Sequence, residues 1–221
     1  MKERLAPLSL VTLLAACNAI PQAEAPQRAA VRQSTTYVTP RPEVRQCLAN
    51  LSAERARFTP IPDQYYGAGC STLGAVRLSS LRSDETDLDL TNLGPVTCPL
   101  ANTFADWARF GVDRAAQQIL GSALVRIETM GSYNCRNVAG SSHRSAHATA
   151  SAIDVSGFVL ADGRRITISG DWNSTSPRVR SFLTTIHTSA CKRFGTVLSP
   201  AYNTAHQNHL HLELSASPFC R

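Results

Sequence analysis

Four of the six histidines in this 221-residue chain lie in two short stretches. The first reads Ser-Ala-His-Ala-Thr-Ala-Ser-Ala-Ile-Asp and contains His147 and Asp154, and the second, His-Gln-Asn-His-Leu-His, contains His206, His209 and His211. Imidazole and carboxylate groups bind zinc and transfer protons in proteins. The two stretches therefore predict one site of metal binding or acid–base chemistry.

The second stretch continues as an alternating segment, which predicts a strand over residues 208–214. Alternation puts leucines on one face and polar residues on the other, so that the two outward imidazoles project side by side: Leu210, Leu212 and Leu214 against His209, His211 and Glu213. Taken alone, such a pair also occurs on exposed strands without a metal. Metal binding therefore depends on what the first stretch adds.

His147 and Asp154 are separated by seven residues, an odd number, so they cannot share one face of a single strand. We expect His147 in a loop and Asp154 on the strand that follows, over residues 152–159. A carboxylate in the run Ala-Ile-Asp-Val is partly buried and needs a cation or strong donors, although a hydrogen-bonded turn residue is the alternative. Two histidines and one aspartate would leave a fourth position for water, as in catalytic zinc sites.

The rest of the chain predicts an α+β scaffold of one domain without internal repeats. The helical periods and alternating runs predict helices beginning at residue 43 and spanning 99–120 and 177–191, and strands at 73–79, 87–92, 123–130, 152–159, 164–169, 194–198 and 208–214. The helix over 99–120 has large apolar residues at steps of three and four, which favours packing in the core over a binding face.

The N-terminal 17 residues predict an export signal. A short basic segment precedes the apolar run 5–16, which is too short to span a bilayer. The run ends in Leu-Ala-Ala-Cys17, which resembles the lipobox of bacterial lipoproteins and implies a lipid anchor on Cys17. The alternative is an ordinary signal cleaved near residues 23–25. We expect a periplasmic protein attached to the outer membrane, because no strong signal for retention in the inner membrane follows Cys17.

Residues 18–41 are rich in Pro, Ala, Gln and Thr and predict a flexible linker before a domain over 42–221. Six cysteines remain after Cys17, and an even number in an exported chain predicts three disulfides whose connectivity stays open: Cys47, Cys70, Cys98, Cys135, Cys191 and Cys220. A cysteine-ligated zinc site is disfavoured, because the chain contains no Cys-x-x-Cys pair.

The net charge of +6 is mild and dispersed, with no run of five or more Lys or Arg residues. This pattern does not indicate a nucleic-acid partner. A basic surface suits an anionic polymer of the cell envelope, and solubility alone explains it equally well.

The first stretch resembles the Ser-x-His-x-x-Gly-x-Ala-x-Asp signature of zinc D-Ala-D-Ala carboxypeptidases, which lie within a wider group that includes lysostaphin-type endopeptidases and the hedgehog signalling domain. The second stretch matches the second half of that signature. More closely, residues 45–221 resemble the bacterial family named after its extensin-like C-terminal region, through Gly-Ser-Tyr-Asn-Cys-Arg at 131–136, Cys-Lys-Arg-Phe-Gly-Thr-Val-Leu at 191–198, and His-Leu-Glu-Leu at 211–214. The resemblance implies a disulfide-stabilised hedgehog/DD-peptidase-like fold with an antiparallel sheet of about four to six strands flanked by helices.

Carried over to this chain, the resemblance implies that His147, Asp154 and His211 bind Zn²⁺. His209 would be the general base beside the zinc-bound water, and His206 would assist it from the preceding loop. Some relatives use a glutamate in Glu-x-Trp-His as the base. This chain lacks that sequence, which favours His209.

Three residues near the first stretch are further candidates. The resemblance implies that Arg136 holds a substrate carboxylate or an oxyanion, with a surface salt bridge as the alternative. His143 and Ser145 are weaker candidates, either as hydrogen-bond donors that support the metal ligands or as ordinary loop residues. Ala150 stands where the signature has glycine, so a positive φ there would strain the loop and could alter activity.

These features predict a zinc-dependent peptidase or amidase of the cell envelope that acts on peptidoglycan peptides. A non-catalytic module that uses the same fold to bind wall peptides or a partner is the main alternative. A hydrolase with another nucleophile is disfavoured, because no Gly-x-Ser-x-Gly sequence occurs and the cysteines are expected to pair. The sequence leaves open the bond that is cut, whether the chemistry is that of a D,D-carboxypeptidase or an endopeptidase, and the oligomeric state.

Overall fold

The computed structural model describes residues 41–221. The predicted signal, Cys17 and the linker up to residue 40 lie outside the described residues. Within the described part, no helix is both long and apolar enough to cross a membrane.

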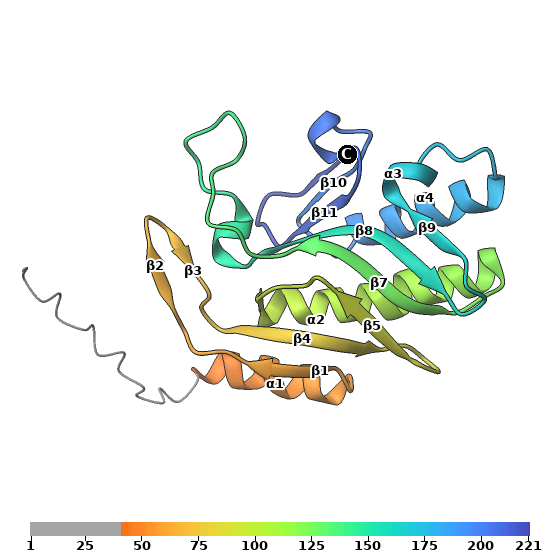
Figure 1. The fold of residues 1–221 in the computed structure, drawn as a ribbon. Coiled ribbons are helices and arrows are strands. Elements are labelled where there is room, and N and C mark those ends of the chain that lie inside the picture. The colour runs from red at the N-terminus through yellow and green to blue at the C-terminus, as the bar shows by residue number, and fades with distance from the viewer. Residues whose placement is uncertain (1–40) are drawn as a thin grey trace, which may run out of the picture. The chain divides into compact units, whose positions relative to one another are not determined.

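A ten-stranded mixed sheet forms the centre of the fold (Figure 1). Its main path runs β1-β4-β5-β7-β8-β11-β10-β12, with β6 paired to β4 and β9 to β8. Most neighbours are antiparallel, but β5 with β7 and β10 with β12 are parallel. The strands are β1 (Arg57–Pro60), β4 (Ala75–Arg82), β5 (Asp87–Thr91), β6 (Val96–Thr97), β7 (Leu124–Gly131), β8 (Ala152–Leu160), β9 (Arg165–Thr167), β10 (Thr196–Leu198), β11 (Leu210–Glu213) and β12 (Phe219–Cys220).

The α+β class is confirmed, but the expected antiparallel sheet of four to six strands was wrong. The additional strands are short and lack a clear apolar alternation: β6 and β12 have two residues each, and β1 (Arg57–Pro60) is largely exposed. Such segments join the sheet through backbone hydrogen bonds, which leave no periodic signal in the sequence. The long strands expected at 123–130 and 152–159 are present as β7 and β8, and the strand expected at 164–169 is present as the shorter β9, which pairs with β8.

Four α-helices accompany the sheet in the described part: α1 (Pro42–Ala53), α2 (Cys98–Asp106), α3 (Ile168–Asp171) and α4 (Pro177–Cys191). Helical turns of the wider π type continue α2 over Trp107–Asp113 and Ala116–Leu120. The expected helix over 99–120 is therefore confirmed, and it stops at Gly121, whose φ of 74° is left-handed. A small separate sheet pairs β2 (Tyr65–Gly67) with β3 (Cys70–Ser71).

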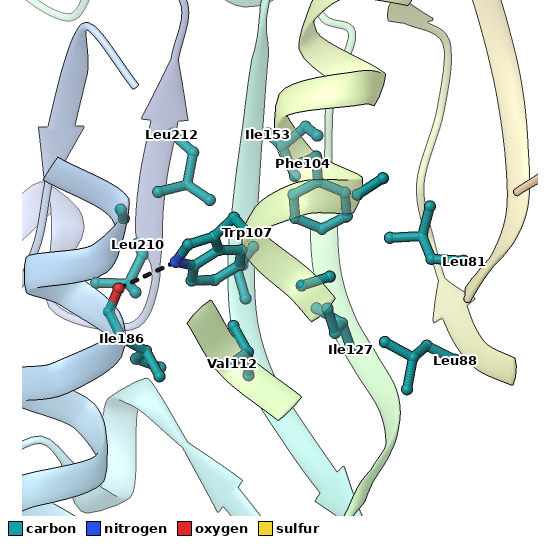
Figure 2. Close-up of a cluster of buried hydrophobic side chains, with 14 of the residues drawn as sticks. Leu81, Leu88, Phe104, Trp107, Val112, Ile127, Ile153, Ile186, Leu210 and Leu212 are labelled. Carbon is teal, nitrogen blue, oxygen red and sulfur yellow. Dashed lines mark hydrogen bonds between the residues drawn. The ribbon is translucent and has the colours of Figure 1, made fainter. Parts of the chain in front are cut away.

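The core lies between the sheet and the long helix, with Trp107 near its centre (Figure 2). The indole nitrogen of Trp107 donates to the carbonyl of Ile186 at 3.0 Å, which ties the long helix to α4. Leu210 and Leu212 of β11 are fully buried on this side of the sheet. The alternation of β11 therefore turns His211 toward the opposite face.

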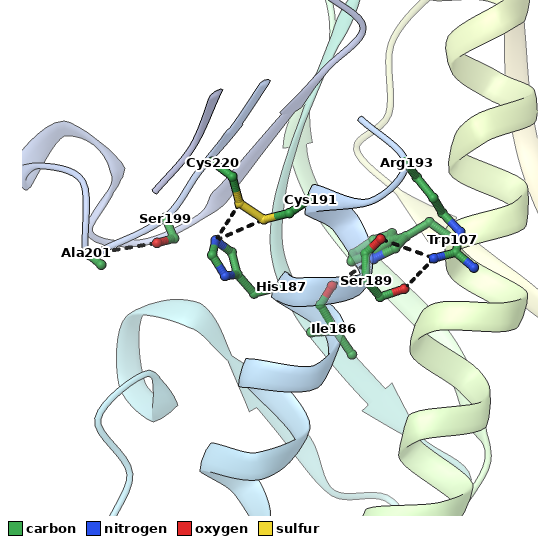
Figure 3. The surroundings of a disulfide bond; sticks show 9 residues. All are labelled: Trp107, Ile186, His187, Ser189, Cys191, Arg193, Ser199, Ala201 and Cys220. Atoms are coloured by element: carbon green, nitrogen blue, oxygen red, sulfur yellow. Dashed lines mark hydrogen bonds between the residues drawn. A yellow bond between two sulfur atoms is a disulfide. The ribbon is translucent and has the colours of Figure 1, made fainter. Parts of the chain in front are cut away.

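Three disulfides join distant segments, as expected from the even cysteine count. Cys47–Cys98 links α1 to α2, and Cys70–Cys135 links β3 to the loop after β7. Cys191–Cys220 links the end of α4 to β12, as Figure 3 shows. Each bridge closes a long loop, which limits the entropy of the unfolded chain.

Candidate metal centre

The pairing of β8 with β11 brings Asp154 and His211 together. The two strands are antiparallel, and His211 lies directly opposite Asp154 in their register. Directly opposed residues of neighbouring strands have their side chains close together on one face. Leu210 and Leu212 occupy the core face of the sheet. The opposite face therefore carries His211, Asp154 and the adjacent His209.

His147 reaches the same place from a short 3-10 turn, Ala146–Thr149, just before β8. The hydroxyl of Ser145 accepts the backbone N–H of His147 at 3.4 Å and so caps this turn. Ala150 ends the turn with φ of 55°, the left-handed conformation anticipated for the glycine position of the signature. Its carbonyl accepts the N–H of Thr97 at 2.9 Å, so this strained turn is fixed to the sheet.

The three expected ligands converge with the spacing of a tetrahedral site. Nε2 of His147 lies 3.2 Å from Oδ2 of Asp154 and 3.2 Å from Nδ1 of His211, and that Nδ1 lies 3.0 Å from Oδ1 of Asp154. Zinc bonds of about 2.0–2.1 Å in a tetrahedron put ligand atoms ~3.3 Å apart. The donor set and its spacing therefore fit zinc.

The other nitrogen of each imidazole has its own partner. Nδ1 of His147 lies 3.0 Å from the carbonyl of Ser132, which can only accept, so Nδ1 carries the proton. Nε2 of His211 lies 3.2 Å from a carboxylate oxygen of Glu213. In neutral histidines, these bonds leave Nε2 of His147 and Nδ1 of His211 as two lone pairs that face each other, which a shared cation, either a proton or a metal ion, would satisfy.

The electrostatics of Asp154 and His211 favour a positive charge beside the carboxylate, and without a metal ion that charge is the proton on His211, which a bound cation would displace. Burial opposes ionisation of Asp154, but hydrogen bonds from His147 and His211 hold its pKa well below the usual range. Burial likewise opposes a charge on His211, yet its bonds to Asp154 and Glu213 raise its pKa to about 9. A carboxylate that stays charged in this buried position supplies the negative charge for a metal ion.

His209 and His206 lie beside these three residues. Nε2 of His209 is 3.6 Å from Oδ1 of Asp154, and its Nδ1 is 2.9 Å from the side-chain oxygen of Asn208. Burial lowers the pKa of His209, and burial together with the charge of His209 lowers that of His206 to about 4. Both imidazoles are therefore neutral near pH 7 and can accept a proton.

Arg136 lines the same small cavity as His147 and Asp154, of about 90 Å³. Its side chain is exposed and bonds only weakly, to the carbonyl of Asn137 at 3.3 Å. The guanidinium makes no salt bridge among those found in residues 41–221. It is therefore free to meet an anionic group that enters the cavity.

Two weaker candidates have other surroundings. His143 is exposed and bonds to the hydroxyl of Ser141 at 3.1 Å, away from the three converging residues. Ser145 acts as the cap of the turn that holds His147. Sequence reasoning did not assign roles to Glu213 or to the carbonyl of Ser132. The only sequence signal for Glu213 is its position two residues after His211, on the same strand face. The backbone carbonyl of Ser132 leaves no signal in the sequence.

A second group of metal-binding residue types contains His187, Cys191 and Cys220. The two sulfur atoms are bonded to each other, and Nε2 of His187 lies 3.9 Å from both (Figure 3). Metals bind thiolates, and disulfide sulfurs no longer provide them. In its oxidised form, this group does not provide a metal site.

The family model described as the extensin-like protein C-terminus matches residues 45–221. The chain belongs to this family. No curated protein and no solved structure matches it significantly. The extensin-like domain thus contains both histidine stretches and all six cysteines that form the bridges. Its relationship to the zinc carboxypeptidases stays a prediction from the sequence signature.

Proposed function

We propose that this extensin-like domain is a zinc-dependent peptidase or amidase of hedgehog/DD-peptidase-like fold that hydrolyses peptidoglycan peptides in the cell envelope. The observation that supports it best is the convergence of His147, Asp154 and His211, each histidine with its second nitrogen already bonded. Three ligands from rigid elements leave a position open to water, which is the arrangement of catalytic zinc. Zinc bound there would polarise the scissile carbonyl and acidify its bound water.

His209 is the proposed general base. Its Nε2 lies on the ligand side, 3.6 Å from Asp154, while Nδ1 is directed to Asn208. In the tautomer with the proton on Nδ1, Nε2 can accept a proton from water and later donate it to the leaving amine. Asn208 selects this tautomer when its side-chain oxygen faces the ring. His206, whose ring centre is 5.1 Å from that of His209, supports the ring from the turn Thr204–His206.

Arg136 is the proposed group that orients the substrate. An exposed guanidinium at the edge of the small cavity can form two parallel hydrogen bonds to a carboxylate. Stem peptides of the wall carry such groups. Export and a lipid anchor on Cys17 would place the domain where this substrate occurs.

The test is incubation of the zinc-loaded protein with purified peptidoglycan, followed by mass analysis of the released fragments. We expect fragments that have gained one water at a single amide bond. His147→Ala and Asp154→Ala should lose the bound zinc. His209→Ala should keep the zinc but cleave the peptide about 10²-fold more slowly. His143→Ala is the matched control and should cleave normally. A folded wild-type protein that binds no zinc contradicts the proposal, and zinc binding without cleavage indicates a non-catalytic module.

A further inference from the structure

A larger cavity of about 360 Å³ adjoins the candidate metal centre. Its walls are residues 92–94, which follow β5, and residues 130–133 at the end of β7. The second wall also lines the small cavity that contains His147 and Asp154. One segment of backbone, residues 130–133, therefore lines both cavities.

The pairing of the strands creates this space. β5 accompanies β7 in parallel only as far as the pair Thr91 and Glu128, whereas β7 continues to Gly131. Around and beyond that point side-chain hydrogen bonds tie the two segments together. The amide of Asn92 donates to the carbonyl of Thr129 at 3.3 Å, and the hydroxyl of Thr129 donates to the carbonyl of Thr91 at 2.7 Å. The hydroxyl of Ser132 donates to the carbonyl of Pro95 at 2.8 Å. The cavity lies where β7 no longer has β5 beside it, although β7 stays paired with β8 on its other edge as far as Gly131.

Each wall of the cavity contains a glycine. A β-carbon on Gly94 would meet the hydroxyl of Ser132 at 3.2 Å, so the close approach of the walls depends on the small residue. Gly131 has φ of 115°, and a β-carbon there would meet nothing within 4 Å, which is consistent with open space beside it. Exposed main-chain groups at the end of a strand can bind an extended peptide through backbone hydrogen bonds.

The cavity is neutral and has one aromatic residue. Its lining residues contain no ionised side chain, in contrast to the small cavity, which has Arg136 and Asp154. Tyr133 lines both cavities, and its ring centre lies 5.4 Å from that of Tyr66. Tyr66 lies on β2, whose partner β3 is linked by Cys70–Cys135 to the loop after Tyr133. Met130 is 48% exposed at the same wall.

We propose that this cavity binds an extended, uncharged peptide segment of the substrate next to the scissile bond, with Tyr133 and Met130 as residues that determine specificity. The inference rests on the proposed peptidase function and adds the direction in which the substrate lies across the site. The uncharged segment lies along residues 130–133, and the carboxylate-bearing part of the substrate faces Arg136.

The experiment measures how the full zinc-loaded chain binds and cleaves a synthetic stem pentapeptide whose central residues are uncharged. Tyr133→Ala removes the ring, and Met130→Trp narrows the cavity. Each should raise KM about tenfold with little change in kcat, because the interaction is made equally in the ground and transition states. Zinc content should stay unchanged. Tyr65→Ala is the matched control, since Tyr65 is 77% exposed on β2 and lines neither cavity.

The outcomes separate this inference from the proposed function. Peptide-dependent NMR shifts at Met130 and Tyr133 without cleavage support the binding segment and contradict the peptidase. Cleavage with unchanged KM in both variants overturns the binding segment and leaves the peptidase standing. If the wild type neither binds nor cleaves the peptide, both are wrong.

Discussion

The candidate metal centre depends on a few residues outside the expected ligand set. Glu213 and the carbonyl of Ser132 hold the outer nitrogens of His211 and His147 at 3.2 and 3.0 Å. Such partners fix the tautomer and the ring orientation, and a carboxylate also makes the imidazole a better ligand. The two imidazoles proposed as ligands are thus held in a fixed orientation by the protein itself.

Glu213→Gln tests this role. The substitution removes the negative charge that favours the proton on Nε2 of His211, while the side chain keeps its shape. We expect zinc affinity to fall about 10- to 100-fold, measured by competition with a chromophoric chelator. Glu85→Gln, in the turn between β4 and β5, is the control and should bind zinc normally. Equal affinities of the two variants would show that Glu213 does not support the site.

Ala150 is the strained residue of the first stretch, with φ of 55° and a fully buried side chain. A left-handed alanine costs ~1–2 kcal/mol. Glycine would relieve this cost, but would add ~0.4–1 kcal/mol of unfolded-state entropy and lose one methyl group worth ~0.8 kcal/mol.

We therefore expect Ala150→Gly to change the free energy of unfolding by less than about 1 kcal/mol, because these contributions nearly cancel. Ala150→Val should destabilise by more than about 2 kcal/mol, because a β-branched residue fits neither the left-handed backbone nor the packed surroundings. Urea unfolding of both variants measures the difference. A valine variant as stable as the wild type would contradict the strained turn.

Among the elements, the first two helices are held together covalently. Cys47 and Cys98 are both buried, and the side-chain amide of Asn102 donates to the carbonyl of Cys47 at 3.1 Å. The bridge spans 51 residues of chain, which include β1 to β6. Its removal therefore releases a large loop in the unfolded state.

We expect the double variant Cys47→Ala/Cys98→Ala to lose about 2–5 kcal/mol in the free energy of unfolding, measured in urea. Each single variant already breaks the bridge, so it should lose nearly as much as the double variant. Additive losses from the two single variants would contradict this, because they would indicate separate packing contributions instead of a shared bond.

At the scale of the whole molecule, an ion cluster on the surface joins the sheet to the long helix. Asp84, in the turn between β4 and β5, accepts hydrogen bonds from Arg109 at 2.7 Å and from Arg114 at 2.8 Å. The bonds from Arg114 and Arg109 lower the pKa of Asp84 to about 2. The ionised carboxylate is thus favoured in the folded state over the unfolded state.

Asp84→Asn should lower Tm at pH 7, and the difference from the wild type should shrink as the pH falls from about 4 to 2. The sign follows from the lowered pKa: this stabilisation is present above the unfolded pKa and is lost as the pH falls through the folded one. Thermal unfolding followed by circular dichroism measures it, with the neighbouring Glu85→Gln as control. A difference in Tm that is constant from pH 7 to 2 would contradict this role of Asp84.

The sequence by itself determined the α+β class, the long helices and strands, and the two stretches that converge at the site. Apolar periodicity survives in single segments such as 99–120 and 152–159, and residue types with specific chemistry, such as His147 and His211, are recognisable without a fold. The family resemblance confirmed over residues 45–221 rested on the same local motifs.

Only the tertiary structure decided the ten-stranded sheet, the disulfide partners and the surroundings of the ligands. Backbone pairing of short strands, the register that opposes His211 to Asp154, and the carbonyl of Ser132 depend on contacts between segments far apart in the chain. The cavity beside Gly131 has the same origin, since it exists because β5 ends before β7 does. Such features arise where two distant segments meet, and the sequence of either segment alone does not specify the contact between them.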